Sequence, residues 1–482
     1  MLKDAPLSLA LLGVGLAAAG LLVDRPVGAG VLGLALLVAL VVSSTDSAPA
    51  SRDSKVAGML ALALVGMCVV ITSSWVLMID FVFALMLASH AAAGGKTLEE
   101  VARSSFVLFI RLKAGALLIV RPLLGPLRRV TEGRATFYVR GSLAAIVLMC
   151  VFGGLFLSAD RAFLELAGDI LVPHVDRSLV PVRLVIFMAV SLLGAGLITS
   201  RLYDLNGARE AFANVDYSTQ TNRATRTEWM IPLVSLDALF AAFVTVQLAV
   251  LFGGRDHVLQ TTGLTYAEYA RQGFFQLVAV ALLTLAVVVG AVRWSKVDSD
   301  SERNLLRFLL GLLCVLTLVV LASALKRLSL YEEVFGLTRL RISVHATILW
   351  LAGIFLMVIA AGVSWRTSWV PRAAMYFTGC GLLAFSLANP DAQIARQNID
   401  RFGSSSDLDV AYLATLSQDA WPELAALPED QFDCMSIDPG GAESLSPLSW
   451  NLSRQRALEA IDEHANVEGS CPASLSRSAP ED

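Results

Sequence analysis

Eleven long apolar runs, separated by short polar connections, fill most of the first 388 residues of this chain. A helix needs roughly 17–25 apolar residues to cross the hydrocarbon layer of a bilayer, where it satisfies its own backbone hydrogen bonds. The composition agrees, because 56% of the residues are hydrophobic and only 16% are charged. A soluble chain could not bury that much apolar surface. The sequence therefore predicts an all-α, polytopic integral membrane bundle of about eleven transmembrane helices.

The predicted spans lie at residues 6–23, 27–42, 56–71, 74–93, 141–158, 182–200, 229–252, 273–292, 305–325, 342–363 and 370–388. Residues 106–127 are also apolar but carry Arg111, Lys113 and Arg121. Charges at the bilayer centre are costly, so we expect an amphipathic helix lying in the membrane interface. A true span at 106–127 is the alternative, and it would invert the orientation of everything that follows.

The distribution of Lys and Arg predicts the orientation. With a cytoplasmic N-terminus, the predicted inner loops carry twenty of these cations and the outer loops eight, as the positive-inside rule requires. The predicted organisation is then N-terminal transmembrane helices at 1–93, a basic cytoplasmic loop with the interfacial helix at 94–140, the main transmembrane bundle at 141–388, and an extracytoplasmic domain at 389–482. We expect a multi-pass protein of a bacterial cytoplasmic (inner) membrane.

The polar tail reads as a small, α-rich folded domain. Apolar spacing predicts short helices at 392–402, 408–416 and 453–464. Cys434 and Cys471 are the two cysteines of this tail. In an exported domain such a pair would usually form a disulfide, whereas in a reducing cytosol both thiols would stay free.

Two stretches in the second half of the chain carry a family resemblance. The first is Gly253–Phe274 with its continuation through Leu330 and Tyr331 to Arg341. The second begins at Asn389-Pro390-Asp391 and runs to Ser417-Gln418-Asp419-Ala420. Together they resemble the bacterial polytopic membrane proteins catalogued as domain of unknown function 4173, or its close neighbour 4153. The resemblance implies a class and a topology, and it implies no activity.

Polar side chains inside the predicted spans are candidate functional residues. Asp80 and Asp237 lie in mid-span, where an ionisable group indicates by default an ion or proton path or a buried pair. Gln247 and Gln276 could join Asp237 in a polar seam between helices. The alternative for all four is ordinary hydrogen bonding between packed helices.

Two predicted outer loops offer further candidates. Thr265 and Glu268 have the spacing of a capping box at the start of a short helix, which could gate a cavity or simply tie two spans together. Arg339 and Arg341 could clamp a phosphate or carboxylate, since guanidinium binds these groups in a bidentate manner. Alternatively, they form ion pairs with the nearby Glu332 and Glu333.

Several chemistries are excluded by missing motifs. The sequence has no GxxxxGK[ST] nucleotide loop, no HExxH zinc motif and no GxSxG nucleophile elbow. It also lacks a basic stripe for nucleic acid, and nothing indicates a cofactor or a metal. We expect transport or handling of a lipid or envelope component, through a polar cavity between the helices of 229–363. The alternative is a non-enzymatic envelope sensor or assembly partner acting through the tail, and a membrane glycosyltransferase ranks last. The expected partners are the lipid bilayer and an envelope protein.

Overall fold

A computed structural model describes residues 5–21, 26–44, 51–95, 100–102, 104–106, 108, 180–202, 226–252, 274–295, 297–364, 368–402, 408–427 and 446–462. In these residues the regular structure is helical. The elements are α1 (Ala5–Leu21), α2 (Ala29–Ser43), α3 (Arg52–Gly66), η1 (Met67–Val69), α4 (Ser74–Ala93), α8 (Val180–Leu202), α10 (Arg226–Phe252), α13 (Phe274–Trp294), α14 (Asp300–Phe335), α15 (Arg339–Ser364), α16 (Val370–Leu387), α17 (Pro390–Phe402), α18 (Val410–Ala414), η3 (Gln418–Ala420), α19 (Trp421–Leu424) and α21 (Leu452–Asp462).

The predicted all-α class is confirmed, and ten of the eleven predicted spans coincide with helices. The remaining span, 141–158, and most of the predicted interfacial helix at 106–127 lie outside the described residues. By length and composition, three of the described helices can cross a membrane: Ser74–Ala93, Asp300–Glu333 and Arg339–Ser364. Shorter apolar helices lie at Leu9–Gly20, Ala29–Ser43, Ile186–Ile198, Trp229–Thr245 and Leu277–Arg293. Apolar helices of this kind are compatible with a membrane protein.

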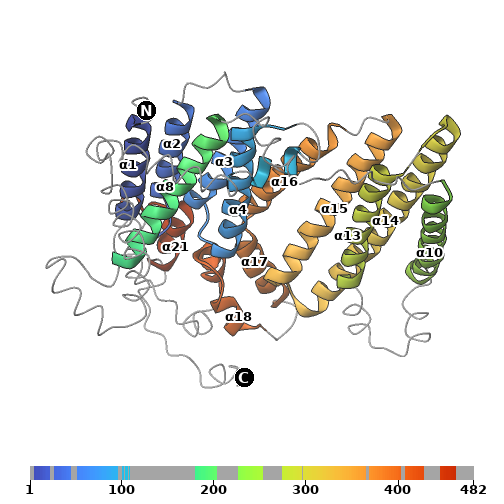
Figure 1. The fold of residues 1–482 in the computed structure, drawn as a ribbon. Coiled ribbons are helices and arrows are strands. Elements are labelled where there is room, and N and C mark those ends of the chain that lie inside the picture. Colours follow the sequence, from blue (N-terminus) through green and yellow to red (C-terminus); the bar gives the residue numbers. More distant parts are fainter. Residues whose placement is uncertain are drawn as a thin grey trace, which may run out of the picture.

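Two groups of helices lie side by side in Figure 1. We call α1, α2, α3, α4, α8 and α16 the N-terminal helix group, and α10, α13, α14 and α15 the central helix group. Small residues bring α1 and α8 together, because a Cβ at Gly194 would lie 2.7 Å from the side chain of Leu11. The central helix group encloses its own apolar core, in which Leu313 and Phe355 are fully buried.

The helix pair α15 and α16 joins the two groups. The Trp350 indole N–H donates to Thr378 Oγ1 at 2.9 Å, halfway along this pair. The Phe377 ring packs against Gly353, where any side chain would collide with it. Because α16 also packs on α3 and α4, this helix hairpin connects the N-terminal helix group to the central one.

The described helix ends lie at two opposite faces of the bundle. At the lower face of Figure 1 lie the start of α4, the turn between α14 and α15, and the C-terminal helices α17, α18 and α21. At the upper face Arg372 pairs with Asp53 at 3.2 Å, and Arg307 donates to the carbonyl of Val363. Every connection predicted on the outer side that the structure describes is at the lower face.

The α14–α15 connection differs from the sequence prediction. Lys326, Arg327 and the Tyr331-Glu332-Glu333 stretch belong to the last turns of α14, and Arg339 and Arg341 belong to the first turn of α15. The predicted outer loop at 326–341 is therefore reduced to residues 336–338. A hydropathy prediction places the end of a span where charged residues begin. The helix itself continues past that point, because its backbone hydrogen bonds do not depend on whether the side chains are apolar or charged.

The C-terminal helices pack against the lower face. The three predicted tail helices are confirmed as α17, α18 and α21, with α18 shorter than predicted. Ile394 of α17, Leu413 of α18 and Leu424 of α19 are buried together with Leu337 and Ile342 from the start of α15. The helices α17, α18 and α19 therefore share an apolar core with the start of α15.

Residues 446–455 pack against the N-terminal end of α2, and we call this segment the clip. The backbone N–H groups of Ala29 and Gly30 donate to the carbonyls of Trp450 and Leu448, at 3.0 and 2.7 Å. The Asn451 amide donates to the carbonyls of Cys68 and Ile71, both at 2.9 Å. The clip therefore satisfies helix-end groups of α2 and η1 that would otherwise lack partners.

We predict that Gly28→Ala weakens the clip. A Cβ at Gly28 would lie 2.7 Å from the carbonyl of Ser449 and from the carbonyl oxygen of Trp450. Because these obstacles are backbone atoms, the clip must shift, at a cost of about 1–3 kcal/mol. Thermal unfolding in detergent measures the loss. Gly33→Ala is the control, since a Cβ there meets nothing within 4 Å; equal stability of the two variants would contradict the prediction.

Candidate functional site

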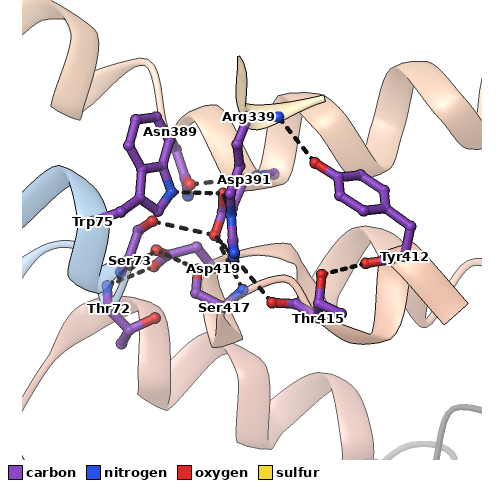
Figure 2. Close-up of polar contacts among 11 residues, drawn as sticks. Thr72, Ser73, Trp75, Arg339, Asn389, Asp391, Tyr412, Thr415, Ser417 and Asp419 are labelled. Carbon is purple, nitrogen blue, oxygen red and sulfur yellow. Dashed lines mark hydrogen bonds and ion pairs between the residues drawn. The ribbon is translucent and has the colours of Figure 1, made fainter. Parts of the chain in front are cut away.

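The carboxylate of Asp391, at the start of α17, lies at the centre of a polar cluster on the lower face (Figure 2). Its side chain is fully buried. The Arg339 guanidinium approaches both oxygens, with Nε 3.0 Å from Oδ1 and Nη2 2.7 Å from Oδ2. The Trp75 indole N–H, the Ser73 hydroxyl and the Ser417 backbone N–H each donate at 3.1 Å. These five contacts saturate the acceptor sites of one carboxylate.

The electrostatics of Asp391 favour its ionised form. Burial alone would raise the pKa of this carboxyl, but the Arg339 guanidinium and the Ser417 N–H outweigh burial and hold the pKa below its ordinary value. A buried carboxylate is stable only when paired and hydrogen-bonded, and here it is both. Asp391 is therefore an anchor for positive and N–H groups from three different elements.

A second buried acid, Asp419 in η3, binds the backbone of the two residues that precede α4. Its carboxylate accepts from the backbone N–H groups of Thr72, at 2.8 and 3.1 Å, and of Ser73, at 2.8 Å. The Ser417 hydroxyl donates to it at 2.8 Å. An acid at this place satisfies N–H groups next to the helix N-terminus and interacts favourably with the helix dipole.

Arg339 connects the central helix group to the C-terminal helices. Besides pairing with Asp391, its Nη2 donates to the carbonyl of Thr415 at 3.0 Å, and its backbone N–H donates to the Tyr412 hydroxyl at 2.9 Å. A cation in the first turn of a helix is unfavourable to the helix dipole, and the Asp391 charge offsets this. We call Thr72, Ser73, Trp75, Arg339, Asp391, Tyr412, Thr415, Ser417 and Asp419 the latch.

The turn between α14 and α15, next to the latch, is held by a left-handed glycine and by hydrogen bonds to α17. Gly336 ends α14 with φ +74°, a left-handed conformation that favours glycine. Asn398 of α17 accepts from the Leu337 N–H at 3.0 Å and donates to the Leu337 carbonyl at 2.8 Å. A side chain at Gly336 would collide with the Asn398 amide. The α14–α15 turn therefore docks on α17.

The two predicted intramembrane acids are both buried. Asp80 of α4 accepts a hydrogen bond from the Ser386 hydroxyl of α16 at 2.7 Å through Oδ2, while Oδ1 has no partner among the described residues. Asp237 of α10 is 5% exposed. Neither of its carboxylate oxygens has a hydrogen-bond partner among the described residues.

The two outer arginines have different partners from those predicted. Arg339 pairs with Asp391, and Glu332 interacts with His345 Nδ1 at 3.0 Å. The observed partner of Arg339 is therefore Asp391, which the sequence did not indicate. Arg341 donates to the carbonyl of Phe335 at 2.9 Å and lies 4.4 Å from the centre of the Tyr331 ring. Comparing charges between neighbouring residues could not identify the partner of Arg339, because Asp391 lies 52 residues further along the chain.

Other candidates lie outside what the structure describes. Thr265, Glu268, Cys434 and Cys471 fall outside the described residues. Gln247 belongs to α10 and Gln276 to α13, but their side chains are likewise undescribed. The capping box, the disulfide and the polar seam around Asp237 remain predictions.

Sequence reasoning assigned no role to Asp391, Asp419 or Trp75. A signal was present, because Asn389-Pro390-Asp391 and Ser417-Gln418-Asp419 are among the residues that carry the family resemblance. Asn389 adopts a left-handed conformation, with φ 52°, that directs the chain from α16 into α17. The sequence marked this bend but could not identify what the following aspartate binds.

The described residues define the class as an all-helical protein whose apolar helices are compatible with a membrane protein. A family model, described as a domain of unknown function (DUF4153), matches residues 59–427. The chain belongs to this family, which is the second of the two neighbours that the sequence resembles. No curated protein and no solved structure matches the chain. The matched residues include the whole latch together with Asp80 and Asp237.

We predict that Asp391→Asn destabilises the junction between the bundle and the C-terminal helices. Breaking a fully buried ion pair by removing one partner costs about 3–5 kcal/mol. Because the Arg339 side chain is 34% exposed, water offsets part of this cost, and we expect a loss of about 2–3 kcal/mol. Unfolding of the purified protein in detergent measures this loss. Asp300→Asn is the control, because it removes an exposed pair with Arg303 at 2.8 Å and should cost at most about 1 kcal/mol.

Acidification provides a second readout of the same pair. The pKa of Asp391 is lower in the folded protein than the value of about 4 of an unfolded chain. Its contribution is therefore present above pH about 4 and is lost as the pH falls through the folded pKa. The stabilities of the parent and Asp391→Asn should converge on acidification; a constant difference would contradict this role.

Proposed function

We propose that this protein transports or handles a lipid or envelope component in the bacterial cytoplasmic membrane, with Asp237 as the ion- or proton-handling group. The observation that carries the proposal is the burial of Asp237 with both carboxylate oxygens unpartnered among the described residues. A group of this kind in an apolar helix bundle is costly and is by default a functional residue.

The position of Asp237 in α10 strengthens the proposal. The buried residues of α10 recur every three or four positions and form one stripe. They are Trp229, Leu233, Asp237, Phe240 and Val244. An apolar residue at the centre of this stripe would pack better and more cheaply. Asp237 instead puts a carboxyl group on the face that packs against α14.

The surroundings of Asp237 are apolar or weakly polar. The apolar members of its stripe share a core with α14 residues such as Leu313 and Cys314. Thr317, one turn further along α14, is buried and donates its hydroxyl hydrogen to the Leu313 carbonyl at 2.7 Å. In a medium of this kind an uncompensated negative charge is costly. Proton uptake and release at Asp237 would then accompany each transport cycle.

We predict that Asp237→Asn leaves the fold intact and abolishes activity. The amide keeps the size of the side chain but cannot exchange a proton. Dicyclohexylcarbodiimide, which enters from the lipid phase and reacts with protonated carboxyl groups, should modify the Asp237 peptide of the parent, as read by mass spectrometry. Rescue of the envelope phenotype of a deletion strain measures activity, with Asp300→Asn as the matched control. A folded Asp237→Asn that rescues fully would refute the proposal.

The second candidate is an envelope sensor or assembly partner that acts through the C-terminal helices. It is supported by the latch, which ties these helices to both helix groups. One face of α17 is exposed and polar, formed by Gln393, Arg396, Gln397 and Asp400. Truncation after Ala388 is a poor test, because it removes Asp391 and Asp419 and leaves Arg339 and Trp75 without acceptors. Substitutions on the exposed α17 face keep the latch intact.

Both candidates share a topology that we propose from the charge distribution. Arg52 and Arg372 at the upper face belong to the cation-rich connections, so the upper face is cytoplasmic and the C-terminal helices are extracytoplasmic. Gln397→Cys should therefore react with a membrane-impermeant maleimide in intact cells. Arg52→Cys should react only after lysis, and the parent protein gives the background of its own cysteines. The reverse pattern would put the C-terminal helices in the cytosol.

A further inference from the structure

The clip exposes two large apolar side chains although its backbone is held firmly. Leu448 is 38% and Trp450 is 39% exposed. Their carbonyls accept from Gly30 and Ala29 at the start of α2. Between them Ser449 is buried, and its carbonyl accepts from Arg454 Nη1 at 2.8 Å. The two apolar side chains are thus presented outward by a fixed backbone.

The exposed side chains continue an apolar face of α2. The exposed large residues of α2 are Leu36, Leu37 and Leu40. Gly30 stands seven residues before Leu37 and therefore lies on the same side of the helix. The Leu448 Cβ is 3.6 Å from the place a Cβ on Gly30 would take. Leu448 therefore extends this apolar face beyond the point where the helix itself has only glycine.

The helix α2 is shorter than the hydrocarbon layer is thick, so apolar surface added at its end would be in contact with lipid. Its 15 residues span only about 22 Å at 1.5 Å per residue, whereas the hydrocarbon layer is about 30 Å thick. A short hydrophobic helix leaves a mismatch that the protein must cover or the bilayer must absorb by thinning. Leu448 and Trp450 add apolar surface at the N-terminal end of α2.

Trp450 has the chemistry of an interfacial anchor. Its ring is exposed on the apolar side, while its indole N–H donates to Gln455 Oε1 at 3.0 Å. An indole with a satisfied polar edge and an apolar body suits the boundary between lipid headgroups and acyl chains. The backbone bond from Ala29 places it level with the start of α2.

We propose that Leu448 and Trp450 form a lipid-binding surface that rests on the bilayer at the lower face, with phospholipid as its partner. The clip then lies along the membrane instead of projecting into solvent. This surface lies outside residues 59–427, which the family model matches. It holds or fails independently of any transport activity.

Tryptophan quenching in proteoliposomes tests the proposal. The parent is compared with Trp450→Phe, which keeps an apolar ring, and the difference in emission reports on Trp450. Phospholipids brominated near the headgroup should quench this difference more than lipids brominated near the chain ends, and aqueous iodide should quench it little. Circular dichroism in the same vesicles establishes that both proteins are folded.

Two outcomes would overturn the proposal. Quenching by iodide without quenching by bromolipids would place Trp450 in water. Resistance to both quenchers would mean that another protein or a second copy of the chain covers it. Leu448→Gln gives an independent measurement, because a polar residue on a lipid surface should move Trp450 toward water and increase its quenching by iodide. Unchanged quenching in that folded variant would equally contradict the proposal.

Discussion

The ion pair between the buried Asp391 carboxylate and the partly exposed Arg339 side chain is the interaction on which the lower face depends. It brings the start of α15, the start of α4 and the junction of α16 with α17 to one point. Each of these helix ends has N–H groups or a charge that would be costly to bury alone. One carboxylate satisfies an arginine, an indole, a hydroxyl and a backbone N–H, so removing it would orphan donors in both helix groups.

Hydropathy could predict the helices because each one is a local property of the chain. Ten predicted spans became helices for this reason, and Asp80 and Asp237 were singled out because an acid in an apolar run is visible in the sequence. The latch is not local. Asp391 lies 316 residues from Trp75 and 52 from Arg339, and no periodicity connects residues at such separations.

Arg339 and Arg341 also show that the sequence alone cannot identify which groups a side chain contacts in the fold. Arg339 and Arg341 stand two positions apart and looked equivalent in the sequence, as a pair that either binds an anion or meets the neighbouring glutamates. In the fold, Arg339 turns to Asp391, while Arg341 lies over Tyr331 and closes the end of α14. Which arginine takes which role depends on the rotation of the first turn of α15 relative to α17, which only the packed structure fixes.

Saturated and unsaturated polar groups divide the molecule into parts with different roles. Each acid of the latch has all its neighbours aligned to it, which favours a fixed junction. Asp237 has no such partner among the described residues and sits in an apolar stripe that would be more stable without it. Packing stability therefore does not account for an acid at this position, and this is the reason for proposing a functional role for Asp237. The family match includes both features, so the latch and the buried, unpartnered Asp237 belong to the same matched region.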